Sequence, residues 1–470
     1  MKKPNATGKR WLRQVCQFVK KFLMKKLFGI FLLLCALPVS ATNYVVLTWR
    51  TNSDDAAWKN VAEALAKKHD GTVIYCDKSL AEAQTELSKI MPRCVAVVAR
   101  PDQLGAEFIN QFHRQMRTLD ADPYTDAQWG VVTGRTADDA MKMVKETSPL
   151  AIKRTASATR IATNFCQEAE CFDELIAKGH SLKKADGKEI EIPLDDADSV
   201  AELAAAFAHP DTQLIITSGH ASQRDWQPGF RYKNGTFHSK NGDLYGLDLK
   251  KNEYPVQSQN AKVYLPCGNC LMGLIDGPDA IALAWMHSAG VRQMAGYVEP
   301  TWYGYMGWGM MDYFVEQPGR YTFTESFFAN NIALVHRLAT VKDLSTQDQK
   351  GLDFDRDMVA FYGDPAWSAT MMKAPLPYEQ KLMQSAGNII VEINPLEGDN
   401  SYEQKNTNGS QRGGRPFIVM LPERIKPDKM KLISPNDNSA VLADNFVLIP
   451  RPPQGSKAQA IRVEWKLVAP

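Results

Sequence analysis

Short apolar runs alternate with amphipathic stretches over the first third of the chain. Buried strands are indicated by four apolar runs, at residues 44–48, 71–76, 94–98 and 129–133. Between these runs apolar side chains recur at helical spacing, as at Trp58, Val61 and Leu65. The spacing predicts four helices, over residues 54–68, 80–90, 104–119 and 137–145. Strands that alternate with helices predict an α/β fold with a mostly parallel sheet covered on both faces.

The alternation continues after residue 150, which suggests a second α/β half. Residues 158–162 are expected to be extended, and helices are expected at residues 168–177 and 199–208. Two further short apolar strands are predicted at residues 214–217 and 261–265. The segment between them, residues 229–257, is rich in Gly, Asn, Lys and Tyr and predicts an exposed insertion or hairpin.

The last part of the chain has short strands without helices. They are predicted at residues 388–393, 417–420, 445–449 and 460–465, separated by Pro, Asn and Gly. This pattern favours a small β-sandwich with an immunoglobulin-like fold. The expected organisation is an N-terminal α/β subdomain at 42–150, a second α/β subdomain at 151–380 and a β domain at 385–470.

The N-terminus has the pattern of an export signal. Residues 1–26 contain nine Lys or Arg and no acid, residues 27–37 are apolar, and small residues precede a predicted cut after Ala41. Residues 1–41 are therefore predicted to be a signal peptide, and Met24 is an alternative translation start. The other interpretation is an uncleaved membrane anchor. Cleavage would leave no membrane span and an exported protein, periplasmic, cell-surface or secreted.

Charge and cysteine content narrow the function classes. The chain has 55 Lys and Arg against 53 Asp and Glu, a net charge of +2 that gives no strong field for binding nucleic acid. Six cysteines remain after the leader, too few for a disulfide scaffold in a chain of this length. Local disulfides are conceivable for two pairs, Cys166 with Cys171 and Cys76 with Cys94.

The strongest chemical signal is one histidine and one cysteine that each follow a predicted strand. His220 comes after the strand at 214–217, and Cys270 follows the strand at 261–265. Ligands bind at the carboxyl ends of parallel strands, so this is where a site is expected. A thiol is a good nucleophile only as thiolate, and a nearby His can take its proton. Backbone N–H groups near Gly219 and Gly273 are candidate oxyanion donors.

Two segments then resemble a known family. Ser218-Gly-His-Ala-Ser-Gln-Arg-Asp-Trp226 resembles the segment around the catalytic His of gingipain-type cysteine peptidases, which belong with caspases, legumains and clostripain. Asn269-Cys270-Leu-Met-Gly273 resembles the family's nucleophile segment, and an Ala-rich helix is expected after it at 280–286. Three further segments resemble parts of the family's catalytic domain: residues 129–135, residues 290–302 and Phe361-Tyr-Gly-Asp-Pro365. The resemblance spans roughly residues 44–375.

The resemblance implies a caspase-like fold of two subdomains and a cysteine endopeptidase that acts on proteins or peptides. Its implied catalytic pair is His220 and Cys270. The resemblance further implies oxyanion or backbone roles for Gly219, Ala221 and Gly273, and a substrate pocket that includes Trp226, Glu299 and Trp302. The best-known members cleave after basic residues. No cofactor is required for the chemistry, whereas structural calcium is compatible with loop carboxylates such as Glu299 and Asp126.

Two departures from the family pattern leave alternatives open. Ala221 replaces the Gly that follows the catalytic His, and Cys267 is a second thiol and an alternative nucleophile. Cys270 is preferred because only it has a Gly three residues later. Cys267-Gly-Asn-Cys270 also spells a redox motif, although such a motif normally opens a helix in a small domain. The rival functions are a catalytically silent binding or adhesion protein and a thiol-dependent transferase or self-processing protein.

Overall fold

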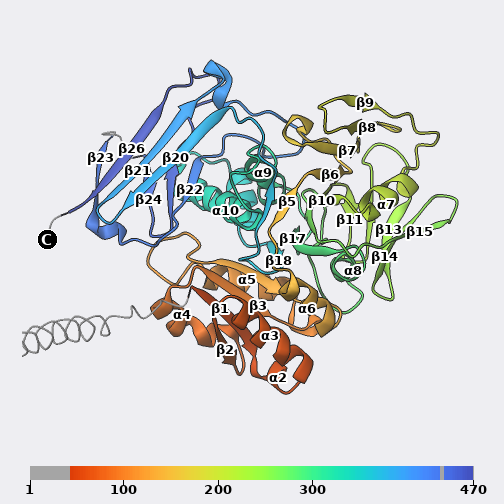
Figure 1. Ribbon diagram of the computed structural model, residues 1–470, viewed down its shortest axis with the longest axis horizontal. Coiled ribbons are helices and arrows are strands. Elements are labelled where there is room, and N and C mark those ends of the chain that lie inside the picture. The colour runs from red at the N-terminus through yellow and green to blue at the C-terminus, as the bar shows by residue number, and fades with distance from the viewer. Residues whose placement is uncertain (1–42, 435–438, 469–470) are drawn as a thin grey trace, which may run out of the picture. The chain divides into compact units, whose positions relative to one another are not determined.

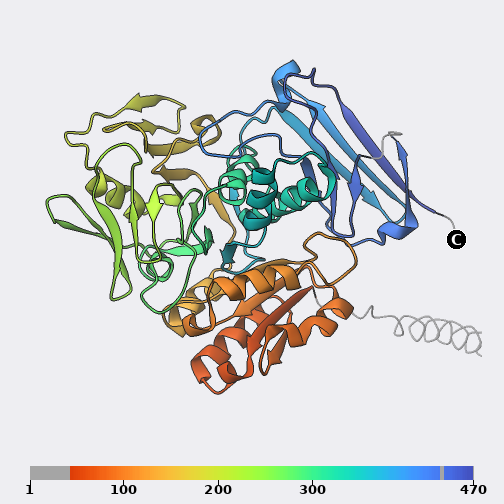
Figure 2. The same cartoon turned by 180° about the vertical axis from the view of Figure 1, so that it is seen from behind.

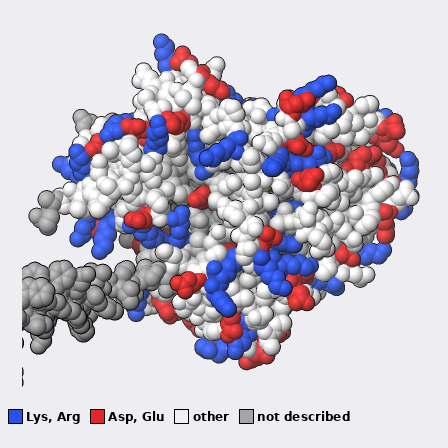
Figure 3. Space-filling view, viewed as in Figure 1, with Lys and Arg blue, Asp and Glu red and all other residues white. Residues whose placement is uncertain are grey.

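The computed structural model describes residues 43–434 and 439–468, and from Tyr44 onward the chain forms one unit. The predicted signal peptide, residues 1–41, lies outside the described residues. None of the helices in the described part combines the length and the apolar character needed to cross a membrane. Basic and acidic side chains are interspersed over the face drawn in Figure 3, in line with the net charge of +2.

Four parallel strands form the first half of a large sheet, in the order β2-β1-β3-β4. They are β1 (Tyr44–Trp49), β2 (Thr72–Cys76), β3 (Cys94–Val98) and β4 (Gln128–Val132). The four predicted strands are confirmed. Every residue of β3 is buried, as expected for an apolar strand that lies between two layers of helices.

Helices pack on both faces of this half (Figures 1 and 2). They are α2 (Arg50–Ser53), α3 (Ala56–Lys68), α4 (Gln84–Ile90), α5 (Ala106–Gln115) and α6 (Ala137–Lys145). α3 packs against α6, and because β-α-β connections are right-handed, the strand order puts α4 and α5 on the opposite face. α3 begins where the Asp55 side chain accepts hydrogen bonds from the N–H groups of Ala57 and Trp58. Its buried stripe includes Val61 and Leu65, as predicted.

The second half continues the same twelve-stranded sheet in the order β18-β17-β16-β10-β6-β7-β8-β9. Its strands are β6 (Arg154–Ser157), β7 (Glu168–Phe172), β8 (His180–Lys183), β9 (Glu189–Glu191), β10 (Thr212–Thr217), β16 (Lys262–Pro266), β17 (Val291–Tyr297) and β18 (Val359–Tyr362). β18 runs parallel to β4 and antiparallel to β17, so the parallel strands of the two halves point in opposite directions. β10 lies between β6 and β16, and all three are parallel.

Five helices accompany the second half. They are α7 (Val200–Ala208), α8 (Ile281–His287), α9 (Tyr305–Phe314), α10 (Phe323–Thr340) and α11 (Thr346–Asp355). Every residue of α9 is buried, so this segment, which is rich in aromatic residues, Met and Gly, is a core helix. Gly307 is needed there, because a Cβ would collide with the Cys267 carbonyl oxygen.

The insertion between β10 and β16 forms a separate antiparallel sheet in the order β11-β12-β13-β14-β15. Its strands are β11 (His220–Ala221), β12 (Asp225–Gln227), β13 (Thr236–Lys240), β14 (Asp243–Leu247) and β15 (Glu253–Val256). The predicted hairpin is therefore confirmed, but it is not wholly exposed, since Phe237, Leu244 and Val256 are fully buried. Two short strands, β5 (Leu150–Ile152) and β19 (Ala369–Met371), pair by themselves.

Two small sheets make up the C-terminal part, in the orders β20-β21-β26-β23 and β22-β25-β24. The strands are β20 (Tyr378–Ser385), β21 (Asn388–Pro395), β22 (Phe417–Met420), β23 (Met430–Ser434), β24 (Val441–Leu442), β25 (Phe446–Ile449) and β26 (Ile461–Leu467). Val391 and Val463 from the first sheet share one core with Phe417 and Val447 from the second, which makes a β-sandwich. The predicted fold class is confirmed; the immunoglobulin-like topology and the domain boundaries stay predictions.

The second sheet of the sandwich also packs on the α/β part of the unit. Ile418, Phe446 and Leu448 form a core with Tyr313 of α9 and Ile332 of α10. The alternating strand pattern thus serves two interfaces, with one face of the sheet toward the sandwich core and the other toward helices. The β part is firmly anchored to the helices near the candidate site.

Some local predictions are wrong. Residues 168–177 are not helical, because Glu168–Phe172 is strand β7, where Glu170 pairs with Arg154 on β6 at 2.5 Å. The segment expected to be extended, residues 158–162, directly follows strand β6, which ends at Ser157, and forms no strand of its own in the described chain. The cysteines of the described chain are all free. Cys76 and Cys94 cannot meet, because β1 lies between their strands and they pair with opposite ends of it. Cys166 and Cys171 are likewise unpaired thiols.

The Phe361-to-Pro365 segment has a structural role at the end of the α/β part. The buried Asp364 carboxylate accepts hydrogen bonds from Tyr44 Oη at 2.7 Å and from Lys68 Nζ at 2.9 Å, and it pairs with His69 Nε2 at 2.7 Å. Burial alone would raise the pKa of Asp364, but the hydrogen bond from His69 and the charge of Lys68 lower it to about 2. The Asp364 carboxylate thus links β1, through Tyr44, to the loop that follows β18, the last strand of the large sheet in chain order.

Candidate active site

The loops that carry His220 and Cys270 leave the large sheet side by side. β10 and β16 are adjacent and parallel, with Thr217 opposite Pro266 at their carboxyl ends. His220 comes three residues after Thr217, and Cys270 comes four residues after Pro266. The two predicted catalytic residues therefore belong to neighbouring loops at one edge of the sheet, where parallel α/β sheets bind ligands.

Asn269 joins the two loops directly. Its Nδ2 donates a hydrogen bond to the Gly219 carbonyl oxygen at 3.0 Å, and its Oδ1 accepts one from Thr217 Oγ1 at 2.7 Å. Thr217 Oγ1 in turn lies 2.9 Å from Tyr264 Oη. Asn269 is fully buried, so it holds the residue before His220 against the residue before Cys270. Sequence reasoning missed this role, although a polar residue directly before the predicted nucleophile is a usable signal.

A second contact joins the loops further out. The Gln223 carbonyl oxygen accepts a hydrogen bond from the N–H of Ile281, at the start of α8, at 2.9 Å. Arg224 Nη1 lies 2.6 Å from Asp276 Oδ1. The turn of the hairpin after His220 is thus fixed to the loop after Cys270 by two adjacent residues, Gln223 and Arg224.

His220 is exposed at the start of β11, the edge strand of the small sheet. Its ring lies 5.2 Å from the ring of Phe230, which is itself 43% exposed. Gly219 has φ +116°, and a Cβ there would lie 2.5 Å from the Gln227 carbonyl oxygen, so only glycine fits. The strained turn aims the His220 side chain away from the core.

Ala221 keeps a backbone donor that the hairpin does not use. The N–H of Ser222 bonds to the Asp225 carbonyl oxygen, and Ala221 faces Trp226 as the next pair along the ladder. Hydrogen-bonded and non-hydrogen-bonded pairs alternate in an antiparallel ladder, so the Ala221 N–H points away from β12. Among the described residues, no further strand pairs with β11 on that side. The loss of the family's glycine at this position thus leaves an N–H available.

Trp226 does not line a pocket, which corrects the expectation for this residue. It is fully buried, its ring stacks on Phe237 with centroids 4.9 Å apart, and its Nε1 donates to the Ser218 carbonyl oxygen at 2.8 Å. The indole therefore supports the loop before His220 from below, through its hydrogen bond to the backbone of Ser218.

Cys270 is half-buried, and its Sγ lies 3.6 Å from the Thr301 carbonyl oxygen. The next residue, Leu271, has φ +55°, an uncommon conformation for a leucine. Strained residues of this kind cluster at functional sites, where surrounding contacts hold them in place. In the described chain Cys270 and His220 share no hydrogen bond, and catalytic contacts are often long before substrate binds.

Gly273 has a different role from the one expected. Its N–H donates to the Tyr297 carbonyl oxygen at 2.8 Å, and a Cβ would collide with the Gly296 carbonyl group. The glycine is needed for close packing on β17, and its N–H is not free to bind an oxyanion. The glycine three residues after Cys270 therefore serves backbone packing here.

Cys267 is fully buried, and its Sγ donates to the Thr217 carbonyl oxygen at 3.2 Å. Burial raises the pKa of its thiol well above the usual range. A protonated thiol without solvent access is a poor nucleophile. These properties argue against Cys267 as the nucleophile and against exchange chemistry at this pair of cysteines.

The wall beside Cys270 carries the other predicted pocket residues. Trp302 follows Thr301 and is 52% exposed, with its ring 6.4 Å from that of Phe354. The half-buried Glu299 accepts a hydrogen bond from the Leu271 N–H at 3.4 Å through its backbone oxygen. Phe230 lies beside His220, and Trp302 directly follows Thr301, the residue that contacts Cys270, so both loops have an exposed aromatic side chain nearby.

A loop from the C-terminal part reaches this region, which sequence reasoning did not foresee. Asn408 Nδ2 donates to Glu174 Oε1 at 2.8 Å, and Ser410 Oγ donates to the Tyr303 carbonyl oxygen at 2.8 Å. The backbone oxygen of Glu174 accepts from the N–H of Phe230 at 2.6 Å. The β part therefore supports both aromatic walls, through residues next to Phe230 and Trp302.

Three carboxylates elsewhere lie close enough to share a cation. Oxygens of Asp120, Asp122 and Asp126 are within 4.8 Å of one another in the described chain. Burial, followed by the charge of Asp120, raises the pKa of Asp126. Such oxygens are of the type that Ca²⁺ binds. Asp126 was one of the two acids considered for calcium; Glu299 has no such partners among the described residues, and calcium binding stays a prediction.

Comparison with known proteins gives a similarity of structure only. No family model and no curated protein matches the sequence. The chain is similar to the crystal structure of the Arg-specific cysteine proteinase gingipain R (RgpB), with a TM-score of 0.45 and 10% identity over 92% of this chain and 93% of that one. It is also similar to a complex of Porphyromonas gingivalis RgpB pro- and mature domains, with a TM-score of 0.44 and 11% identity over 87% of this chain and 93% of that one. Both neighbours are of the gingipain type that the motifs resemble.

Proposed function

We propose that this chain is an exported cysteine endopeptidase with His220 and Cys270 as its catalytic pair. The observation that carries the proposal is the Asn269–Gly219 hydrogen bond, which ties the loop of a half-buried thiol to the loop of an exposed imidazole. The rival thiol, Cys267, is buried and protonated. Export is supported by the leader pattern of residues 1–41.

In the proposed mechanism His220 takes the proton of the Cys270 thiol, and the thiolate attacks the carbonyl carbon of the scissile peptide bond. The protonated imidazole then gives its proton to the leaving amine as the carbon–nitrogen bond breaks, which leaves a thioester. His220 next removes a proton from water, which attacks the thioester and releases the carboxylic acid and the thiol. No metal or cofactor takes part in these steps.

The oxyanion of each tetrahedral intermediate requires a hydrogen-bond donor close to the thiol. The Ala221 N–H is the best candidate, because the hairpin ladder leaves it unused. The Gly219 N–H is a second candidate on the same loop. Gly273 is excluded from this role, since its N–H already donates to Tyr297.

The substrate is proposed to lie between Phe230 and Trp302, the two exposed aromatic side chains beside the pair. Aromatic walls bind the aliphatic part of a side chain and also stack on a guanidinium group. Basic-residue specificity, which the resemblance implies, additionally needs an acid. Glu299, three residues before Trp302 and half-buried, is the candidate for that acid.

The second candidate function is a secreted binding protein that keeps the peptidase fold without activity. Two observations favour it: Ala221 in place of the family's Gly, and the lack of a hydrogen bond between His220 and Cys270 in the described chain. Such a protein would use the exposed Phe230 and Trp302 to hold a partner.

The test is covalent labelling of the purified protein with peptide acyloxymethyl ketones that carry basic, acidic or apolar residues before the reactive group. The peptidase predicts labelling that is lost in Cys270→Ala and His220→Ala. Cys267→Ser is the matched control, since its hydroxyl can keep the hydrogen bond to Thr217, and it should still be labelled. Absence of labelling by all three probe classes, with calcium present and after limited proteolysis, would favour the binding protein.

A further inference from the structure

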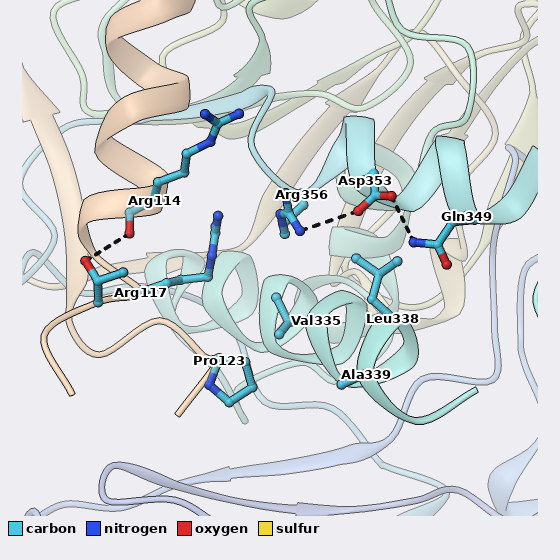
Figure 4. A pocket seen from close by; sticks show the side chains of 10 residues that line it. Arg114, Arg117, Pro123, Val335, Leu338, Ala339, Gln349, Asp353 and Arg356 are labelled. Carbon is cyan, nitrogen blue, oxygen red and sulfur yellow. Dashed lines mark hydrogen bonds and ion pairs between the residues drawn. The ribbon is translucent and has the colours of Figure 1, made fainter. Parts of the chain in front are cut away.

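A cavity of about 520 Å³ opens between the carboxyl-terminal ends of α5 and α10 and the helix α11 (Figure 4). Three arginines, Arg114, Arg117 and Arg356, reach into it from two different segments of the chain. None of the residues assigned to the peptidase site lines this cavity. Its size falls within the range of small-molecule sites in proteins.

The arginines are only partly neutralised by the acids around them. The buried carboxylate of Asp357 lies 2.7 Å from Arg117 Nη1, 3.3 Å from Arg356 Nε and 3.6 Å from Arg114 Nε. Arg356 Nη1 also pairs with the more exposed Asp353 at 3.4 Å. Two carboxylates therefore face three guanidinium groups, and the cavity keeps an excess of one positive charge.

Several donors of these groups remain unused. Among the described residues, the two Nη atoms of Arg114 and Nη2 of Arg117 and Arg356 form no hydrogen bond. Arg117 Nη1 is buried without a well-aligned hydrogen bond, although it lies close to Asp357. The Arg117 side chain is only 10% exposed, so water reaches its guanidinium poorly. Unpaired guanidinium donors at the edge of a cavity are suited to a planar carboxylate, which they can bind through two parallel hydrogen bonds.

The opposite wall of the cavity is apolar. Val335, Leu338 and Ala339 line it from the last turns of α10, and Pro123 completes the wall (Figure 4). Val335 is buried and Leu338 is half-buried, so packing against neighbouring residues holds these apolar side chains in place. A ligand that fills the cavity must combine a negative group with an apolar part.

We propose that this cavity binds a small organic anion, namely a carboxylate on a short aliphatic chain. The carboxylate accepts hydrogen bonds from Arg114 and Arg117 and balances the excess charge, and the chain lies against Val335 and Leu338. Each half of the ligand contributes, because a charged hydrogen bond is stronger than a neutral one and buried apolar surface adds to the binding free energy.

The test is calorimetric titration of the full chain with hexanoate, with hexanamide and acetate as comparisons. Hexanamide has the chain without the charge, and acetate has the charge with almost no chain. Hexanoate should bind at least about tenfold more tightly than either, because hexanamide loses the charged hydrogen bonds and acetate loses the apolar contacts of the chain. No hexanoate binding, or equal binding of hexanoate and hexanamide, would overturn the proposal.

Variants locate the site. Arg114→Gln removes an arginine whose side chain is 61% exposed, so the fold should persist, and hexanoate binding should weaken about tenfold. Arg356→Gln provides a second variant if the first fails to fold. Lys350→Gln is the matched control, because it makes the same charge change at an exposed residue of α11 that does not line the cavity. Equal hexanoate binding by Arg114→Gln and Lys350→Gln would place the anion elsewhere and contradict the assignment.

Discussion

Asn269 Nδ2 donates a hydrogen bond to the Gly219 carbonyl oxygen at 3.0 Å, across the two loops that follow β10 and β16. Because these residues directly precede Cys270 and His220, one buried amide sets the separation of the two candidate catalytic residues. The amide is itself oriented by Thr217. If Asn269 positions the pair, its loss should lower the rate of catalysis; if its role is purely structural, its loss should lower only the stability of the fold.

Asn269→Ala is expected to lower kcat by about 100-fold with little change in KM, since a small misplacement of reacting groups has effects of that size. The unpaired Thr217 hydroxyl and Gly219 carbonyl should also cost about 1–3 kcal/mol of stability. Peptide hydrolysis kinetics and urea unfolding measure the two effects.

Asn52→Ala is the matched control, because Asn52 is also buried and also bonds two side chains, Thr48 and Gln103, but far along the sequence from the site. It should lose similar stability and keep kcat. Equal losses of kcat in both variants would contradict a positioning role for Asn269.

Gly219→Ala is expected to abolish labelling of Cys270 by peptide ketones and to reduce stability by about 1–3 kcal/mol. The reason is steric: φ is +116°, and a Cβ would lie 2.5 Å from the Gln227 carbonyl oxygen, so the turn before His220 must change. Labelling yield and thermal unfolding check both effects.

Gly277→Ala makes the same change later in the Cys270 loop, at a position where a Cβ meets nothing within 4 Å. It should label and unfold like the wild-type protein. If Gly219→Ala labels normally, the imidazole does not need its present position and the proposed pair is wrong.

The stability of the fold should fall as the pH drops from about 6.5 toward 4, in part because of His113. Its Nε2 lies 2.8 Å from the Val359 carbonyl oxygen, whereas its Nδ1 is buried without a hydrogen-bond partner in the described chain. Burial lowers the pKa of His113 to about 4. A lowered folded-state pKa means that the stabilisation is complete above the unfolded-state pKa and is lost as the pH falls toward the folded-state value.

The shift from 6.5 to about 4 corresponds to about 3 kcal/mol. His113→Gln keeps a donor for Val359 but does not titrate, so its urea-unfolding free energy should depend less on pH between 6.5 and 4. The same slope in wild type and variant would show that other groups cause the acid sensitivity.

The sequence by itself was enough for the main elements and for the placement of the candidate pair. Apolar runs such as residues 94–98 predict buried strands because a strand between two helical layers has no polar face. The position of His220 and Cys270 just after two such strands put them at one sheet edge, since parallel neighbours end together. These inferences depend on local pattern and chain order, which the sequence contains directly.

Secondary-structure prediction from the local pattern of apolar and polar residues failed where pairing with distant residues decides the conformation. Glu168–Phe172 forms a strand because its backbone pairs with β6 on one side and β8 on the other, and Glu170 also pairs with Arg154 on β6; local periodicity encodes none of these contacts. The buried helix α9 lies close to the backbone of Cys267, where Gly307 leaves room, and this contact is also not encoded by local periodicity.

Only the tertiary structure decided which side chains face solvent at the site. Cys267 and Cys270 differ in access because Cys267 lies beneath Thr217 and against α9, whereas Cys270 lies beyond the sheet edge. Trp226 supports a loop rather than a pocket, and Gly273 packs on β17. Burial and hydrogen-bond partners arise from segments far apart in the chain, so the sequence determines the chemical groups available, and the packing of distant segments determines which of them can meet a substrate.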